Sequence, residues 1–409
     1  KGKYADLIEA EAKVRLHGLA NLYLYFVVRL VQQLTPTGRA ALIVPAEFLD
    51  QVAGRSVKQM LVERRLLRGV VWFHSENSIF EDAMTTAAIL LISNDSATHP
   101  GSVAFVSAET TAACAEIEAS ISTTTPNVTL GRMVPLHALD PADRWRTHVS
   151  GEETPTVVGG IALGSYAKIR HGITTGANKF FVRSRSAWAA LGIDERFLAP
   201  VVPKSVMVPG VVFTDADFDR LDAADARVWL LTAREEEASD PALAALLNGP
   251  AVDEVRARPT LRSRRDRWFV PPRREAAPIW VSNLSRGRVK IVRNYSRAAT
   301  LDSFHNLTPT DALDVRTFAA VLLSDETKAA VFAVRREYGS GLLKVETSEL
   351  AAALVPDALS LDAESASLLA SLDAELEQAA TEADVDAVIS AIDGALRMEL
   401  PVGDDAAHR

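Results

Sequence analysis

The residues of this sequence that can do chemistry gather in one basic segment, residues 256–297. It holds thirteen Lys or Arg residues opposed only by Asp266 and Glu275, so it carries +11 while the rest of the chain carries −20. The basic residues are Arg256, Arg258, Arg262, Arg264, Arg265, Arg267, Arg273, Arg274, Arg286, Arg288, Lys290, Arg293 and Arg297. Aromatic residues are interleaved with them: Trp268, Phe269, Trp280 and Tyr295. A concentrated basic patch on an acidic protein is typical of a polyanion-binding surface. The alternative is a solvated loop with scattered ion pairs.

A second candidate binding element is the glycine loop, residues 172–176, whose sequence is Gly-Ile-Thr-Thr-Gly. Its glycines permit a close approach of the backbone to a ligand. In and after the loop, four side chains can donate hydrogen bonds to phosphates or base edges: Thr174, Thr175, Asn178 and Lys179. The basic segment adds candidate DNA contacts, since arginine reads guanine with two hydrogen bonds. These candidates are Arg262, Arg264, Arg265, Arg288, Lys290 and Arg293. The alternative for the loop is an ordinary hairpin turn, and we expect Trp268 and Trp280 in the core.

No set of residues forms a self-sufficient catalytic centre. The sequence contains no Gly-x-Gly-x-x-Gly, no Walker lysine loop and no His-Glu-x-x-His. Its eight histidines are scattered without the spacing of metal ligands, so we expect no metal site. The single cysteine, Cys114, excludes an internal disulfide and reads as a small buried apolar residue. With no secretory signal and no apolar run of about 18 residues, a cytoplasmic protein without membrane contact is expected.

These candidates need a scaffold, and residues 1–150 read as the second half of a doubly wound, Rossmann-like α/β sheet. We expect helices over residues 22–34, 54–64 and 109–122, and strands over 39–45, 68–73, 86–93 and 102–106. A Thr-Pro-Thr-Gly turn precedes the first of these strands. A first half with a nucleotide-binding turn is expected upstream.

Two further regions follow a linker at residues 151–155. Residues 151–310 alternate short β-rich runs with Pro and Gly, which predicts a β-rich domain. The expected strands are 157–161, 166–170, 179–182, 211–213, 228–231, 279–282 and 290–292. Residues 311–409 have apolar positions at helical spacing over 314–323, 326–336, 360–380 and 385–398. Asp325 is expected to cap the second of these helices, and Asp362 to lie in the first turn of the third.

An ordered series of local patterns carries a family resemblance over residues 21–356. Three patterns lie in the first region: Asn-Leu-Tyr-Leu-Tyr-Phe at 21–26, Thr-Gly-Arg-Ala-Ala-Leu-Ile-Val-Pro at 37–45, and Ile-Phe-Glu-Asp-Ala-Met followed by a hydrophobic strand at 79–92. Three more follow: the run 163–181, which contains the glycine loop, Ser-Phe-His-Asn-Leu at 303–307, and Tyr-Gly-Ser-Gly-Leu-Leu-Lys-Val at 338–345. In this order they resemble the later blocks of the Taq-type, gamma-class N6-adenine DNA methyltransferases. The resemblance implies a methyltransferase sheet, then a target-recognition domain and helices.

The resemblance also implies roles for two phenylalanines. Such enzymes flip an adenine out of duplex DNA and methylate its N6 with S-adenosylmethionine, and a flat aromatic surface offsets part of the unstacking cost. Phe80 occupies the family position that stacks on the flipped base, with core packing at a strand entrance as its alternative. Phe26 matches a position that lines the pocket for the cofactor's adenine ring. Its alternative is the buried face of an amphipathic helix.

The sequence departs from the family pattern at the catalytic tetrapeptide Asp/Asn-Pro-Pro-Tyr/Phe, which does not occur in it. In the family this element polarises the target amino group. The Gly-containing cofactor loop and the acidic residue for the ribose are absent as well. We expect these motifs, and the main S-adenosylmethionine contacts, a short distance upstream, so that this chain alone only binds DNA.

Three functions are compatible with these observations. The first is the C-terminal part of an adenine-specific DNA methyltransferase in a restriction–modification or phage-defence system, with double-stranded DNA as its partner and restriction or other modification subunits as further partners. The second is a non-catalytic specificity subunit that recognises a DNA sequence, although such subunits typically carry two recognition domains. The third is an unrelated α/β enzyme with an acidic substrate.

Overall fold

The computed structural model describes residues 3–18, 20–73, 86–95, 97, 99–108, 131–150, 157, 159–250, 252–286, 288–338 and 342–399. The chain forms two compact units. Unit 1 comprises Lys1–Thr154 with Arg336–Leu342, and unit 2 comprises Pro155–Arg335 with Leu343–Arg409. The predicted β-rich and helical regions thus fall together in unit 2, apart from Arg336–Leu342.

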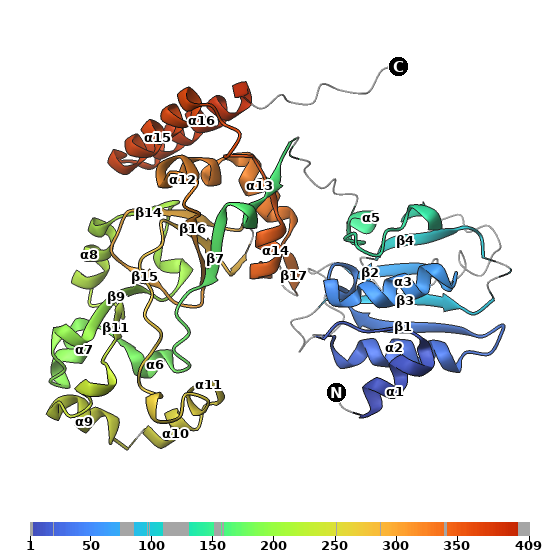
Figure 1. The fold of residues 1–409 in the computed structure, drawn as a ribbon, viewed down its shortest axis with the longest axis horizontal. Coiled ribbons are helices and arrows are strands. Elements are labelled where there is room, and N and C mark those ends of the chain that lie inside the picture. Colours follow the sequence, from blue (N-terminus) through green and yellow to red (C-terminus); the bar gives the residue numbers. More distant parts are fainter. Residues whose placement is uncertain are drawn as a thin grey trace. The chain divides into compact units, whose positions relative to one another are not determined.

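Unit 1 is built on a mixed sheet in the order β1-β3-β2-β4-β5 (Figure 1). The strands are β1 (Arg39–Pro45), β2 (Leu67–Phe73), β3 (Ala87–Ser93), β4 (Ser102–Ala108) and β5 (Gly131–Pro135). β3 runs antiparallel to β1 and β2, β2 runs parallel to β4, and β4 runs antiparallel to β5. The helices are α1 (Lys3–Ala12), α2 (Leu22–Gln33), α3 (Arg55–Glu63) and α5 (Thr147–Ser150), with 3₁₀ turns η1 (Ala46–Leu49), η2 (Val52–Gly54) and η5 (Leu136–Ala138).

Alternating side chains divide this sheet between two apolar clusters. On β2, Val70 and Trp72 belong to the larger cluster, which contains the buried residues of α2 and α3, whereas Val71 and Phe73 belong to a smaller one. This follows from the two-residue period of a strand. A strand buried on both faces reads as a continuous apolar run, which is why β2 and β3 were recognisable in the sequence.

Strand β1 forms one edge of the described sheet, and its partner is β3. Its side chains alternate between a buried face, which includes Val44, and an outward face. On the outward face Ile43 is 63% exposed. An exposed apolar side chain on an edge strand is uncommon, because such edges favour pairing with another chain.

Unit 2 contains a five-stranded sheet in the order β10-β14-β12-β16-β7 and a four-stranded sheet in the order β15-β9-β11-β8. The strands of the first are β7 (Ala167–His171), β10 (Val212–Phe213), β12 (Ile279–Ser282), β14 (Ile291–Asn294) and β16 (Phe304–Pro309). Those of the second are β8 (Val182–Arg183), β9 (Leu198–Val202), β11 (Trp229–Leu231) and β15 (Ala299–Thr300). Further short strands of unit 2 are β6 (Ile161–Ala162) with β19 (Leu354–Val355), and β13 (Leu284–Arg286) with β18 (Leu342–Lys344), whose first residue belongs to unit 1. Strand β17 (Arg336–Tyr338) belongs to unit 1.

The helices of unit 2 fall into two groups along the chain. The earlier ones are α6 (Asn178–Phe181), α7 (Arg185–Ala190), α8 (Asp215–Ala223), α9 (Pro241–Leu247), α10 (Val252–Arg256) and α11 (Pro259–Arg262), with 3₁₀ turns η6 (Leu163–Ser165), η7 (Glu195–Phe197), η8 (Ser205–Met207), η9 (Glu235–Glu237) and η10 (Arg265–Arg267). The later ones are α12 (Val315–Leu323), α13 (Asp325–Ala333), α14 (Thr347–Ala352), α15 (Ala363–Gln378) and α16 (Glu382–Glu399).

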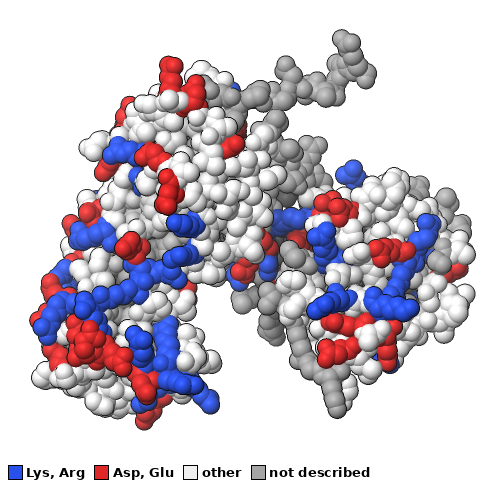
Figure 2. Space-filling model, viewed as in Figure 1, with Lys and Arg blue, Asp and Glu red and all other residues white. Residues whose placement is uncertain are grey.

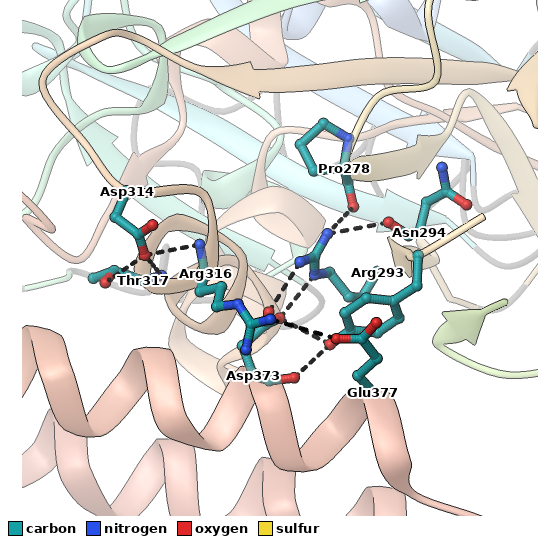
Figure 3. A network of polar contacts seen from close by, with 9 residues as sticks. Pro278, Arg293, Asn294, Asp314, Arg316, Thr317, Asp373 and Glu377 are labelled. Carbon is teal, nitrogen blue, oxygen red and sulfur yellow. Dashed lines mark hydrogen bonds and ion pairs between the residues drawn. The ribbon is translucent and has the colours of Figure 1, made fainter. Parts of the chain in front are cut away.

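A shared apolar core joins the later helices to the five-stranded sheet. One cluster contains Ile279, Val281 and Leu307 of the sheet together with Phe318 of α12 and Leu369 of α15. A buried ion pair reinforces this junction: the Arg293 guanidinium on β14 donates to both carboxylate oxygens of Asp373 on α15, at 2.7 and 2.9 Å (Figure 3). The predicted helical region therefore shares one apolar core with the five-stranded sheet of the predicted β-rich region.

The fold class predicted from the sequence is confirmed, with an α/β unit, a β-rich region and C-terminal helices. Several predicted elements are wrong in detail. Residues 179–182 were expected as a strand, yet α6 occupies most of that run, because the Phe180 and Phe181 amides both donate to the Ala177 carbonyl. Of the described residues in the predicted strand 157–161, residues 157, 159 and 160 are not in a strand, and β6 begins at Ile161. The cap of α13 is Ser324, with Asp325 as the first helical residue, and Asp362 is the cap of α15.

Candidate nucleic-acid interface

The glycine loop connects β7 to α6 and needs glycine at both ends. A Cβ added to Gly172 would lie 2.0 Å from the main-chain oxygen of Leu301. Gly176 has a φ of +80°, which side-chain-bearing residues rarely adopt, and its Cβ would lie 3.0 Å from Thr260 on α11. Between them Ile173 is buried and bridges to Leu301. The loop is thus pressed against β15 and α11 along its backbone.

The four polar residues predicted in and after this loop divide into two kinds. Thr174, Asn178 and Lys179 are exposed. Thr175 is fully buried: its hydroxyl donates to the Asn178 side-chain oxygen and accepts from the Ala177 amide, 3.0 Å away. Thr175 therefore shapes the turn into α6 and is not available to a ligand, a correction to its predicted role.

The basic segment meets the glycine loop through Arg264. Its guanidinium donates to the main-chain oxygens of Thr174 at 2.7 Å and Thr175 at 3.4 Å. Burial lowers the pKa of this guanidinium. Two residues before and one after it in sequence, Arg262 and Arg265 are exposed. The two features singled out separately in the sequence therefore lie side by side.

Two more arginines bind main-chain oxygens of the same stretch. Arg258 donates to the Gly176 oxygen at 3.4 Å. Arg227 donates to the oxygens of Lys179 at 3.1 Å and Val182 at 2.7 Å, with a longer contact of 3.4 Å to Asn178. Sequence reasoning missed Arg227, because it lies outside the basic segment and follows an acidic helix. Only the fold shows which carbonyls it reaches.

An aromatic core supports this surface from below. Trp268 is 6% exposed and lies 5.7 Å from Phe180 and 6.0 Å from Phe269, measured between ring centroids. Trp280 is fully buried in a neighbouring cluster, so the expectation that both tryptophans are core residues is confirmed. The guanidinium of Arg256 lies 5.9 Å from the Trp268 ring, within the range of a cation–π contact.

The basic segment finds more acidic partners than its own sequence offers. Carboxylates from other parts of unit 2 pair with Arg267 (Glu235, 3.2 Å), Arg297 (Asp215, 3.1 Å, and Asp219, 2.9 Å) and Arg293. Figure 2 shows acidic side chains beside the basic ones at the α10–α11 end of unit 2. The charge of +11 therefore overstates the positive field, and the partners were invisible in the local sequence. In the described part of the chain, Arg262, Arg265, Arg274, Arg286 and Arg288 form no ion pair.

The predicted contacts near β14 have partners other than the glycine loop. Arg293 is 6% exposed and, besides Asp373, donates to the main-chain oxygens of Pro278 and Asn294 at 3.3 and 3.1 Å (Figure 3). Lys290 donates to the carbonyl of Val208, and burial lowers its pKa. Arg288 is exposed. Among the described residues no hydrogen bond or ion pair joins these three to the loop, and the buried, paired Arg293 is structural.

In unit 1 the candidate residues are the two phenylalanines. Phe26 lies on α2, which Asn21 caps, and it is 64% exposed, one turn after Leu22, which is also 64% exposed. The alternative of a buried helix face is wrong for Phe26, since the buried face of α2 consists of Leu24, Tyr25, Val27, Val28 and Val31. Phe80 and Cys114 lie outside the described residues.

Within the described ranges, no group of three or more His, Cys, Asp or Glu residues is placed to hold a metal ion. Over the same ranges, no helix has the length and apolar character needed to cross a membrane.

Comparisons with known proteins assign the chain to a family. Residues 159–395 match the family described as the C-terminal domain of the type II methyltransferase M.Eco57I, and residues 9–124 match the N-6 DNA methylase family. The chain therefore belongs to the M.Eco57I C-terminal family. The resemblance to gamma-class N6-adenine methyltransferases is confirmed.

Two curated relatives are type II methyltransferases, and one solved structure shares the fold. The chain is 29% identical over 359 residues to the type II methyltransferase M.AccI of Acinetobacter calcoaceticus, covering 87% of this chain and 66% of that protein. It is 24% identical over 358 residues to M.XamI of Xanthomonas campestris pv. amaranthicola, covering 86% and 63%. Its fold is similar to that of the type IIL restriction–modification enzyme MmeI, solved in complex with DNA (TM-score 0.58, 9% identity, 97% of this chain and 52% of that chain).

Proposed function

We propose that this chain, as a member of that family, is the DNA-recognition and target-base part of an adenine-specific DNA methyltransferase. The full-length protein would transfer a methyl group from S-adenosylmethionine to N6 of an adenine flipped out of a specific duplex sequence, in a restriction–modification or phage-defence system. The chain spans 66% and 63% of the lengths of its two curated relatives. We therefore assign the reaction to the full-length protein and duplex DNA binding to this chain.

The observation that carries the proposal is the position of Arg262 and Arg265. Both are exposed, neither is paired with a carboxylate in the described structure, and both lie next to Arg264, which holds the glycine loop. Their charge is therefore available to phosphates. Neutralising phosphates releases counterions, which supplies most of the sequence-independent affinity for DNA. The exposed side chains of Thr174, Asn178 and Lys179 would then lie at the base edges or the adjoining backbone.

In unit 1 the proposal assigns Phe26 to S-adenosylmethionine and Phe80 to the flipped base. The exposed ring of Phe26 fits the apolar face of the cofactor's adenine. The cofactor would supply the methyl group, and Phe26 would fix the orientation of its adenine. Stacking on Phe80 would hold the target base outside the helix and so offset part of the unstacking free energy.

Binding of this chain to duplex DNA at rising salt tests the recognition part. The logarithm of the binding constant should fall linearly with the logarithm of salt concentration, with a slope of about −0.9 for each neutralised phosphate. Replacing Arg262 and Arg265 together by Ala should make the slope shallower by about 1–2. The matched control is Arg297→Ala, whose charge is already compensated by Asp215 and Asp219. Equal slopes for the double variant and the control would remove α11 and η10 from the interface.

Methyl transfer by the full-length protein tests the catalytic part. With a labelled methyl donor, Phe80→Ala should slow transfer while duplex affinity stays near that of the wild type. Phe26→Ala should weaken saturation by the donor, which would appear as a raised KM for S-adenosylmethionine. Unchanged transfer by Phe80→Ala would reduce this residue to a packing role.

A further inference from the structure

The glycine loop and the start of α6 are fixed by an unusual set of partners. Three arginines from different parts of unit 2 donate to main-chain oxygens of the stretch 174–182: Arg227, Arg258 and Arg264. These hydrogen bonds are charge-assisted and therefore stronger than bonds between neutral groups. Because a carbonyl oxygen carries no net charge, these bonds do not cancel the charge of the arginines, although Arg258 also pairs with Glu254 at 4.0 Å.

The backbone of the stretch faces inward and its functional side chains face outward. Buried Ile173 and Thr175 alternate with exposed Thr174. At α6 the buried Phe180 and Phe181 rings lie behind the exposed Asn178 and Lys179. A loop held through its main chain presents the same side chains in the same place whatever those side chains are. Such fixed placement is what base reading requires, since hydrogen bonds weaken steeply with small displacements.

Arg264 differs from the nearby Arg262 in its burial and in its hydrogen-bond partners. It is half-buried, and its two contacts go to consecutive carbonyls of the loop, at 2.7 and 3.4 Å. Arg262, two residues earlier on α11, is exposed and makes no such bond in the described structure. Two arginines of one short segment are thus placed for different tasks.

We infer that Arg264, together with Arg258 and Arg227, is a positioning residue that fixes the glycine loop for sequence reading, and that Arg262 contacts phosphate. The inference rests on the proposed function, because it takes duplex DNA as the ligand. It goes beyond that proposal by separating the arginines that fix the loop for specificity from the arginine that supplies affinity through phosphate. Neither the charge pattern nor the spacing of the sequence distinguishes them.

A pair of single substitutions tests the inference, with a pool of duplexes whose central segment is randomised as the probe. Binding of the pool by this chain is measured at about 50 and 200 mM salt, and the bound duplexes are sequenced. Arg264→Ala should lower the enrichment of preferred sequences about tenfold, the scale of one misread base pair, and leave the salt slope close to that of the wild type. Arg262→Ala should make the slope shallower by about 1 and leave the ranking of sequences intact.

Arg264→Lys and amide hydrogen exchange separate positioning from general damage. Lysine keeps the positive charge but lacks the planar guanidinium that reaches two carbonyls at once. The Arg264→Lys variant should therefore enrich preferred sequences about as weakly as Arg264→Ala does, and less than the wild type. Without DNA, amides of residues 174–182 should exchange faster in Arg264→Ala, while amides of the β12–β16 ladder keep their protection.

Three results would overturn the inference. The first is a loss of salt slope in Arg264→Ala equal to that in Arg262→Ala. The second is unchanged enrichment in Arg264→Ala, and the third is unchanged exchange of the loop amides. A wild-type chain that does not bind the pool at any salt would instead overturn the proposed function. The exchange experiment would still decide whether Arg264 holds the loop.

Discussion

Arg293 and Arg264 come from the same basic segment, yet they stabilise two regions of unit 2 in opposite ways. At the junction of β14 and α15, Arg293 is buried against the Asp373 carboxylate, and its charge is cancelled. At the glycine loop, Arg264 binds carbonyl oxygens and keeps its charge. One region is a neutral scaffold and the other remains positive. The partner, rather than the residue type, decides whether the charge of a structural arginine is cancelled or retained.

The largest expected effect comes from breaking the scaffold pair. Asp373→Ala would leave the Arg293 guanidinium buried without a counter-charge, which should lower the free energy of unfolding by about 3–5 kcal/mol. Urea denaturation followed by tryptophan fluorescence measures it. The control is Asp219→Ala, which removes an exposed partner of Arg297 and should cost about 0–1 kcal/mol. Equal losses in the two variants would mean that burial adds nothing to the Arg293 pair.

A smaller effect is expected at the loop. Gly176→Ala places a side chain at a φ of +80° and brings its Cβ to 3.0 Å from Thr260, so unfolding should become easier by about 1–3 kcal/mol. Gly192→Ala has nearly the same backbone strain, at a φ of +68°, but its nearest neighbour is an ordinary 3.6 Å contact with Ala242. The difference between the two variants isolates the contact with α11. Equal losses of unfolding free energy in the two variants would show that α11 moves aside without cost.

The pH dependence of stability tests a buried, titratable group in the scaffold, His305. His305 on β16 is fully buried, and its Nε2 donates to the Val345 oxygen at 2.7 Å. Burial is the main cause that holds its pKa below the ordinary value, with the nearby His171 acting in the same direction. The unfolded chain therefore binds a proton at higher pH than the folded one, so stability is complete above about pH 6.5 and is lost as the pH falls through the folded pKa.

Comparison of wild type with His305→Gln isolates this contribution. For a single proton the slope is at most about 1.4 kcal/mol per pH unit. Between pH 7 and 5, the wild type should therefore lose more unfolding free energy than the variant, in which glutamine keeps a donor for Val345 but does not titrate. Parallel curves would assign the acid sensitivity to other groups.

Sequence reasoning succeeded where the pattern was long and apolar, and it failed where tertiary partners decide. The limits of β1 and β12 were predicted correctly, because their apolar runs are bounded by clear turn residues. The run 179–182 has the aromatic and β-branched composition of a strand, but the hydroxyl of Thr175 and the carbonyl of Ala177 turn it into α6. The roles of Arg293 and Arg227 depend on groups 80 and about 45 residues away, respectively, which no local pattern reveals.

The position of β1 at the edge of the described sheet bears on how this chain is handled in solution. Among the described strands β1 pairs with β3 alone, and such an edge with the exposed Ile43 is a template on which a strand of another copy can form. Self-association of this kind grows with concentration and would withdraw protein from a binding titration. Affinities for DNA are therefore best measured at dilute protein, and a charged residue in place of Ile43 offers a way to keep the chain monodisperse.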